Sequence, residues 1–250
     1  MSKAFVNFPT CHAVPTVSCG QCRLNAVCLP ISLHIDDIDR VNDIIQRGRP
    51  LQKGDTLYRV KDGFKCIYAV RSGSVKTVTV TDDGREQVTG FYLPGEILGM
   101  DGISTNFHTN TAIAMETTAI CEIPFSQMES LTSSIPSLQR HMFQILGREI
   151  NADQQLITLL SKSSADERVA TFLLSISIRN HRRNLSATSF RLPMSRADIG
   201  NYLGLTVETV SRCLSRLQKQ ALIEADKREI QLLNLDGLRQ VANAEQICAN

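Results

Sequence analysis

The spacing of apolar residues changes once along this chain of 250 residues, close to residue 137, and this change limits the folds open to it. Between residues 49 and 124, short β-branched runs such as Cys66–Val70 and Val88–Tyr92 are separated by turns rich in glycine and aspartate, which is typical of a β-roll or jelly roll. From Ser137 onward, apolar residues recur at steps of three and four, the period of an α-helix. We therefore predict an α+β fold with an N-terminal β-roll and a helical C-terminal half.

Four segments follow from this pattern. They are a cysteine-containing arm (residues 1–34), a β-roll (jelly-roll) sensor domain (35–136), a long helix (137–162) and a winged helix-turn-helix domain (163–250). Within them we expect a helix at Ile35–Gln46, a helix at Ala165–Ile178, a polar, basic loop at Arg179–Ser189 and a hairpin at Leu222–Leu233.

The composition is that of a globular protein with a small net charge of +2. Residues 1–161 carry 14 basic and 16 acidic side chains, whereas residues 162–250 carry 13 and 9, so the C-terminal half is compatible with a phosphate-rich partner. No apolar run approaches the roughly 18 residues that span a bilayer, and the N-terminus lacks the pattern of a signal peptide. We expect a cytoplasmic protein with no membrane partner.

The segment from Arg196 to Gln220 has the pattern of a helix-turn-helix. Gly200 stands where the second helix approaches the first, Gly204 where the turn needs a left-handed backbone, and Thr206 where the second helix needs an N-cap. The shared core would contain Ile199, Leu203, Leu205, Val210 and Cys213. The spacing predicts a double-stranded DNA partner, read in the major groove.

Polar side chains of the second helix project away from this core. They are Glu208, Thr209, Ser211, Arg212, Ser215 and Arg216. An arginine can pair with the O6 and N7 atoms of guanine, and a glutamate can accept from cytosine N4. The alternative is that Glu208 and Arg212, four residues apart, form only a surface ion pair.

Apolar residues of the long helix form a heptad seam that contains one acid. The seam consists of Phe143, Leu146, Ile150, Asp153, Ile157 and Leu160. It predicts a dimerisation helix in which Asp153 faces Asp153 of the second chain across the two-fold axis. The two negative charges would oppose association, so that the monomer and the dimer would be close in free energy. The alternatives are a helix packed on its own β-roll and an Asp153 that faces solvent.

Cysteines gather near the N-terminus, where Cys19, Cys22 and Cys28 share one loop. In a reducing compartment, clustered cysteines are metal or redox ligands before they are disulfides. A metal centre with three thiolate ligands needs a fourth ligand. We assign Cys66 and Cys213 to the core and Cys248 to the C-terminal tail, which leaves Cys11 or Cys121 as the fourth ligand. The spacing does not separate a four-cysteine zinc site from an iron–sulfur cluster.

Across nearly its whole length the chain resembles the FNR regulators of fumarate and nitrate reduction, oxygen-responsive iron–sulfur transcription regulators of the cAMP receptor protein/FNR superfamily. The resemblance is carried by the cysteine spacing and by Gly54, Tyr68–Gly73, Thr117–Phe125 and Ile199–Arg212. It implies that Cys19, Cys22, Cys28 and Cys121 ligate a [4Fe-4S] cluster. It also implies that Glu208, Ser211 and Arg212 read a TTGAT-N4-ATCAA-like palindrome.

The resemblance further implies an oxygen-sensing global regulator, activator and repressor, of anaerobic metabolism genes. The chain would form a homodimer when the cluster is bound and return to inactive monomers when oxygen destroys it. RNA polymerase would be contacted through exposed loops near residues 71–74, 82–85 and 181–186. The runner-up functions are a metalloenzyme or redox carrier, which leaves the helix-turn-helix unexplained, and a zinc-stabilised constitutive DNA-binding protein.

The chain departs at two places from the patterns of the superfamily and of the FNR family. In the superfamily's nucleotide pocket an Arg-Ser pair after a Gly-Glu turn holds the cyclic phosphate; here Gly95-Glu96 is followed by Asn110-Thr111, so we expect no cyclic nucleotide. The residue after the second cysteine, usually a small serine in the FNR family, is Arg23, and Val27 replaces a usual leucine. A guanidinium near an anionic cluster should slow its loss of an electron to oxygen.

Overall fold

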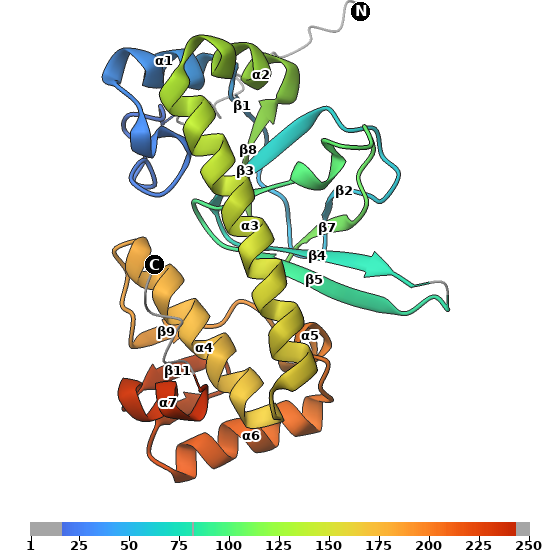
Figure 1. The fold of residues 1–250 in the computed structure, drawn as a ribbon, viewed down its shortest axis with the longest axis vertical. Helices are drawn as coiled ribbons and strands as arrows, with labels where there is room; N and C mark the ends of the chain where they lie inside the picture. The colour runs from blue at the N-terminus through green and yellow to red at the C-terminus, as the bar shows by residue number, and fades with distance from the viewer. Residues whose placement is uncertain (1–16, 82, 244–250) are drawn as a thin grey trace, which may run out of the picture.

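The structure is a computed structural model that describes residues 17–81 and 83–243, so that the expectations for Cys11 and Cys248 concern residues outside this range. A β-roll and a helical domain are joined by one long helix, α3 (Pro136–Lys162), which runs between them in Figure 1. The predicted α+β architecture of β-roll, long helix and C-terminal helix-turn-helix is confirmed. No helix in the described ranges is long and apolar enough to cross a membrane.

The β-roll consists of two antiparallel four-stranded sheets. Their strand orders are β1-β8-β3-β6 and β2-β7-β4-β5. The strands are β1 (Gln46–Arg47), β2 (Thr56–Tyr58), β3 (Cys66–Ser72), β4 (Val75–Val80), β5 (Glu86–Tyr92), β6 (Ile97–Leu98), β7 (Thr111–Ala114) and β8 (Ala119–Pro124). They form from the short β-branched runs because alternate residues of such runs can be buried on one face of a sheet.

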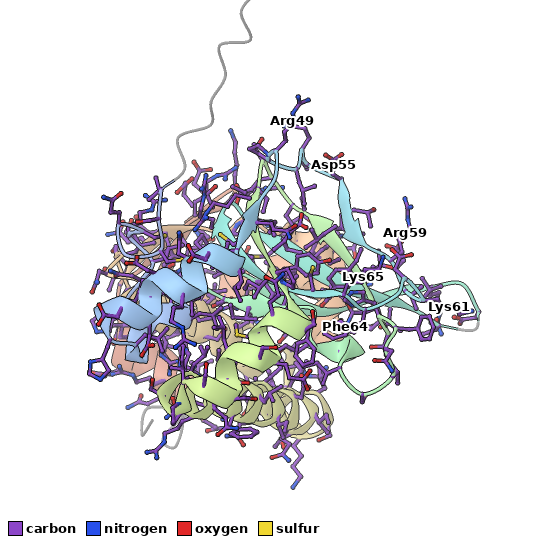
Figure 2. All side chains as sticks on the ribbon, turned by 90° about the horizontal axis from the view of Figure 1, so that it is seen from above. Arg49, Asp55, Arg59, Lys61, Phe64 and Lys65 are labelled. Atoms are coloured by element: carbon purple, nitrogen blue, oxygen red, sulfur yellow. The ribbon has the colours of Figure 1, made fainter. Side chains whose placement is uncertain are left out.

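Short helices precede, interrupt and follow the strands of the roll. They are η1 (Leu29–Ser32), α1 (Ile35–Ile44), η2 (Met100–Gly102) and α2 (Phe125–Ser134). The helix predicted from Ile35 is present and ends at Ile44. Seen from above in Figure 2, the segment around β2 that carries the exposed Arg49, Asp55 and Arg59 lies away from α1 and α2. Phe64 packs on Phe125 of α2, with ring centroids 5.0 Å apart.

The C-terminal domain combines four helices with a small sheet. Its elements are α4 (Ala165–Arg182), β9 (Ser189–Arg191), α5 (Arg196–Leu203), α6 (Val207–Lys219), β10 (Ile223–Asp226), β11 (Glu229–Leu232) and α7 (Leu235–Val241). The predicted hairpin is present as β10–β11, and β9 pairs with it to complete a three-stranded wing.

The loop predicted from Arg179 to Ser189 is wrong at its start, because α4 continues through Arg182. Three basic side chains in the last turn are favoured by the negative end of the helix dipole. Arg179 is also tied to the β-roll, where its Nε donates to the carboxylate of Glu96 at 2.7 Å. The polar, basic segment therefore contains the last turn of a helix followed by a loop, which occupies residues 183–188.

The two domains share a hydrophobic core. Phe91 of β5 packs against Phe172 of α4 and Tyr202 of α5, with ring centroids 6.1 and 5.1 Å apart. Polar contacts border this core, since Lys76 of β4 forms an ion pair with Asp198 of α5 at 2.6 Å. The β4–β5 hairpin thereby holds the first helix of the helix-turn-helix.

Candidate functional site

The three cysteines of the arm and Cys121 of β8 line one cavity between the arm and the β-roll. The loop is closed by the backbone N–H of Cys28, which donates to the carbonyl of Leu24 at 2.9 Å. It is anchored by the buried Leu24 and by Asn42 of α1, whose side chain accepts from the backbone N–H of Cys19 at 3.0 Å. The structure thus brings together the four thiols that the family resemblance selects.

Strand register places a guanidinium beside these thiols. Strand β8 lies between β1 and β3, so that Cys121 stands opposite Arg47 on one side and Ala69 on the other. Opposite residues of antiparallel strands project on the same face. Arg47 Nη2 donates to Asn42 Oδ1 at 2.7 Å and lies 3.5 Å from Cys19 Sγ. Sequence reasoning missed Arg47, because pairing between distant strands leaves no local signal.

Burial dominates the acid–base behaviour of the thiols. It raises the pKa of Cys19 to about 11 and that of Cys28 to about 12, and it also raises the pKa of Cys121. The positive charge of Arg47 acts in the opposite direction on Cys19 and Cys121. Because cysteines bind a metal in the deprotonated, thiolate form, binding of a metal group at this site must release protons.

The lining of the cavity fits an anionic, sulfur-ligated group. Four thiols are the donor set of four-cysteine zinc sites and of iron–sulfur clusters alike. Apolar side chains such as Leu29, Ile45 and Ile123 form much of the wall, and the buried Arg47 Nε has no hydrogen-bond partner. Within residues 17–81 and 83–243, no group of three or more His, Cys, Asp or Glu side chains is arranged so that it could hold a metal ion.

The remaining cysteines and Arg23 lie elsewhere. Cys213 is fully buried in the helix-turn-helix core, as predicted, and Cys66 begins β3 and is half-buried. Arg23 is exposed and does not line the cavity, whereas Arg47 and Arg71 do. The charged groups that border the thiols therefore come from β1 and β3.

The helix-turn-helix is built from caps and one left-handed residue. Gly204 has φ +64°, as the predicted turn requires, and the hydroxyl of Thr206 accepts from the N–H of Thr209 at 3.2 Å to cap α6. The predicted reason for Gly200 is corrected: a Cβ there would lie 2.6 Å from the carbonyl oxygen of Leu205, so the turn, and not the second helix, needs the space.

The outer face of α6 carries the expected reading residues. Glu208 and Arg212 are exposed, while Ser211 is half-buried and accepts from Arg196 Nη1 at 3.1 Å. Hydrogen bonds from its own backbone N–H and from Thr206 hold the pKa of Glu208 below its usual value, with a smaller contribution from the charge of Arg212. Arg216 does not project freely, because it forms an ion pair with Asp166 of α4 at 2.7 Å.

The long helix α3 divides into a buried start and an exposed later part that carries the predicted seam. Leu138, His141 and Met142 in its first turns are buried, which agrees locally with a helix that packs on its own β-roll. Three apolar seam residues spaced by seven lie open in the single chain: Phe143, Ile150 and Ile157, with exposed fractions of 66%, 57% and 66%. Asp153 is also exposed, and Leu146 and Leu160 are half-buried.

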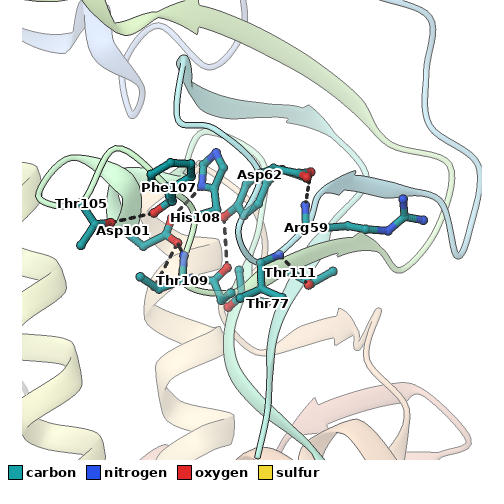
Figure 3. Close-up of polar contacts among 12 residues, drawn as sticks. Arg59, Asp62, Thr77, Asp101, Thr105, Phe107, His108, Thr109 and Thr111 are labelled. Atoms are coloured by element: carbon teal, nitrogen blue, oxygen red, sulfur yellow. Dashed lines mark hydrogen bonds and ion pairs between the residues drawn. The ribbon is translucent and has the colours of Figure 1, made fainter.

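Polar atoms in the region of a nucleotide pocket have partners within the chain. Both carboxylate oxygens of Glu96 accept hydrogen bonds from Arg179. The hydroxyl of Tyr58 donates to Asn110 Oδ1 at 3.3 Å, and Thr111 Oγ1 accepts from the N–H of Val60 at 3.1 Å. The buried neighbouring His108 is held by Asp101 at 3.1 Å (Figure 3).

A β-roll joined to a winged helix-turn-helix is the architecture of a class of DNA-binding transcription regulators. Residues 48–134 match the cyclic nucleotide-binding domain, and residues 167–241 match the Crp-like helix-turn-helix domain. The solved structure of FixK2 from Bradyrhizobium japonicum is similar, with a TM-score of 0.72 and 32% identity over 79% of this chain and 97% of that one.

Proteins of similar sequence show which kind of transcription regulator the chain is. The chain is 51% identical to the transcriptional activator protein FnrA of Stutzerimonas stutzeri over 88% of this chain and 90% of the relative. It is 43% identical to the fumarate and nitrate reduction regulatory protein of Escherichia coli K12, over 90% of each. The chain belongs to the CRP/FNR family, among its FNR- and Anr-type transcriptional activators, and is a regulator and not an enzyme.

Proposed function

We propose that this chain is an oxygen-sensing global transcription regulator whose activity depends on a [4Fe-4S] cluster held by Cys19, Cys22, Cys28 and Cys121. The observation that carries the proposal is the single cavity that these four thiols line. When bound, the cluster supplies an oxygen-labile link between the arm and β8. Zinc on the same four thiols is the competing occupant.

The contacts of the cysteine loop support a coupling to the long helix. The loop runs from Cys28 directly into η1, and Leu29 is buried in the same core as Leu138 of α3. A hydrogen bond joins the side chain of His141, also on α3, to the backbone of Cys28. When a bound cluster holds the cysteine loop in place, the loop therefore supports the first turns of α3. When the cluster is lost and the loop is released, this support is lost.

The exposed seam supports homodimerisation through the later turns of α3. Association would bury Phe143, Ile150 and Ile157, together with Leu146, and would bring two Asp153 carboxylates close together. A small change in packing at the start of the helix can tip such a balanced equilibrium. The monomer would have only one recognition helix, enough for one half-site, and would bind the palindrome too weakly to act.

On DNA, the exposed face of α6 would read a TTGAT-N4-ATCAA-like palindrome through Glu208, Ser211 and Arg212. The dimer would activate or repress genes of anaerobic metabolism in the cytoplasm, with RNA polymerase contacted through loops near residues 71–74, 82–85 and 181–186. We propose no cyclic nucleotide ligand, because Arg179 already pairs with Glu96, and Asn110 and Thr111 are bonded internally.

Anaerobic reconstitution with iron and sulfide tests this function. We expect absorption near ~400 nm that bleaches in air, together with loss of the dimer in sedimentation and loss of the palindrome complex in a gel shift. A Cys121→Ser variant should show none of these air-dependent changes. A colourless protein that binds stoichiometric zinc and holds the palindrome equally in air and under argon would contradict the proposal.

A further inference from the structure

Arg47 connects the two halves of the cysteine cavity, the arm and the β-roll. It ends β1, opposite Cys121 of β8, and its Nη2 lies 3.5 Å from the Sγ atom of Cys19 in the arm. Asn42 fixes this arrangement, because its Oδ1 accepts both from Arg47 Nη2 at 2.7 Å and from the backbone N–H of Cys19 at 3.0 Å. The guanidinium is thus held in place before any group enters the cavity.

One donor of this guanidinium is left over. Arg47 Nε is buried and has no hydrogen-bond partner within the described parts of the chain. A buried N–H without an acceptor is costly and is rare in folded proteins, so its position calls for an acceptor that arrives with a ligand. The cavity beside it is lined mostly by thiols and apolar side chains, and the Arg47 guanidinium already interacts with the thiol of Cys121. The acceptor for Nε would therefore be an atom of the sulfur-ligated group bound there.

The expected charge of the occupied site also favours a role for Arg47. Four thiolates around an iron–sulfur group leave a net negative charge, and a buried charge needs a nearby counter-charge. The guanidinium of an arginine carries a delocalised positive charge and can supply that counter-charge. Arg71 of β3 adds a second positive charge at the cavity wall, whereas Arg23 is exposed and stands outside the lining.

We propose that Arg47 is the positioning residue of the cysteine site, with its guanidinium as counter-charge and its Nε donating a hydrogen bond to a sulfur atom of the bound group. The inference rests on the proposed function. It assigns to Arg47 the influence on electron affinity that the sequence alone suggests for Arg23. Groups that surround a metal site in this way typically change its affinity by about 10–100-fold when removed.

The test compares Arg47→Gln, Arg47→Lys and the matched control Arg23→Ser after anaerobic reconstitution. Iron and sulfide content, the rate of iron loss to a chelator under argon, and the reduction potential are measured. We expect Arg47→Gln to lose iron about ten times faster and to have a lower reduction potential than wild type. Arg47→Lys should keep the potential near that of wild type but lose iron faster, because an ammonium group lacks the fixed fork of donors. Arg23→Ser should match wild type in both readouts.

Other results would overturn the inference. An Arg47→Gln protein with wild-type potential and iron loss would do so, as would an Arg23→Ser protein whose potential shifts as far as that of Arg47→Gln. If Arg47→Gln and Arg47→Lys both take up no iron, thermal unfolding of the cofactor-free proteins decides: unchanged unfolding supports the role at the site, and loss of folding contradicts it. Failure of the proposed function is distinguishable, because wild type itself would then take up no iron–sulfur group.

Discussion

Arg179 of the C-terminal domain forms an ion pair with Glu96 in the turn between β5 and β6, and its Nη2 also donates to the carbonyl of Phe91 at 2.5 Å. The other side of this turn faces the cysteine arm, since a Cβ on Gly95 would lie 2.7 Å from a methyl carbon of Val27. One turn therefore contacts the arm and the DNA-binding domain at once. Its contacts give the two domains a defined relative orientation.

We expect Arg179→Met to destabilise the protein by about 1–3 kcal/mol, because it leaves the partly buried Glu96 carboxylate unpaired. Urea unfolding measures the change, and the double variant with Glu96→Gln should recover part of the loss. Arg85→Gln is the control, since its ion pair with Asp83 is largely exposed and should contribute little to stability. Equal effects of the two arginine substitutions would contradict this account of the turn.

Asp153→Ala should raise the dimer fraction of the cofactor-free protein. The substitution removes the carboxylate repulsion expected across the seam, while Asp153 is exposed in the single chain, so that monomer stability should change little. Sedimentation velocity at several protein concentrations measures the equilibrium. An unchanged dimer fraction would place Asp153 outside the interface.

Ile150→Glu should have the opposite effect and abolish dimerisation of the reconstituted protein. Because Ile150 is 57% exposed in the single chain, we expect monomer unfolding to change by no more than about 0.5 kcal/mol. Sedimentation and urea unfolding together separate an interface role from a folding role. A large loss of monomer stability would mean that the residue packs within its own chain.

Arg212→Ala should weaken binding to the palindrome by about 1–3 kcal/mol and relax the preference at one base pair of each half-site. Lys219→Ala, at the C-terminal end of α6, is the matched control, because we expect this exposed charge to act on the DNA backbone and not on a base. It should weaken binding to all sequences alike and reduce the salt dependence. Gel shifts on single-base variants of the palindrome distinguish the two, and a sequence-independent effect of Arg212→Ala would exclude base reading by this side chain.

Stability should depend on pH through Glu149 of α3. Burial raises the pKa of Glu149, although the hydroxyl of Tyr92, which donates to Oε1 at 2.8 Å, partly offsets this. The ionised form is thus disfavoured by folding, so wild type should lose stability relative to Glu149→Gln as the pH rises from the ordinary value of 4.5 through the higher folded value. Urea unfolding across this range should show the two proteins converging at the acidic end, and a constant difference would contradict the assignment.

Local spacing in the sequence determined the elements of this fold. The β-branched runs and the heptad of the long helix specify strands and helices because side-chain burial follows the period of each element. The left-handed Gly204 and the capping Thr206 were likewise predicted, since turn and cap chemistry depends on neighbouring residues. Three cysteines could be grouped by their spacing alone, whereas the fourth came only from resemblance to a family.

Tertiary structure decided the relationships between distant residues. Strand register sets Arg47 opposite Cys121 and leaves its Nε buried without a partner, and the packing of α4 on the β-roll joins Arg179 to Glu96. The packing of α6 against α4 likewise brings Arg216 to Asp166. None of these pairs follows from a period of two or 3.6 residues, because strand pairing and helix docking are chosen by the burial of whole faces, and polar partners meet only where those faces bring them together.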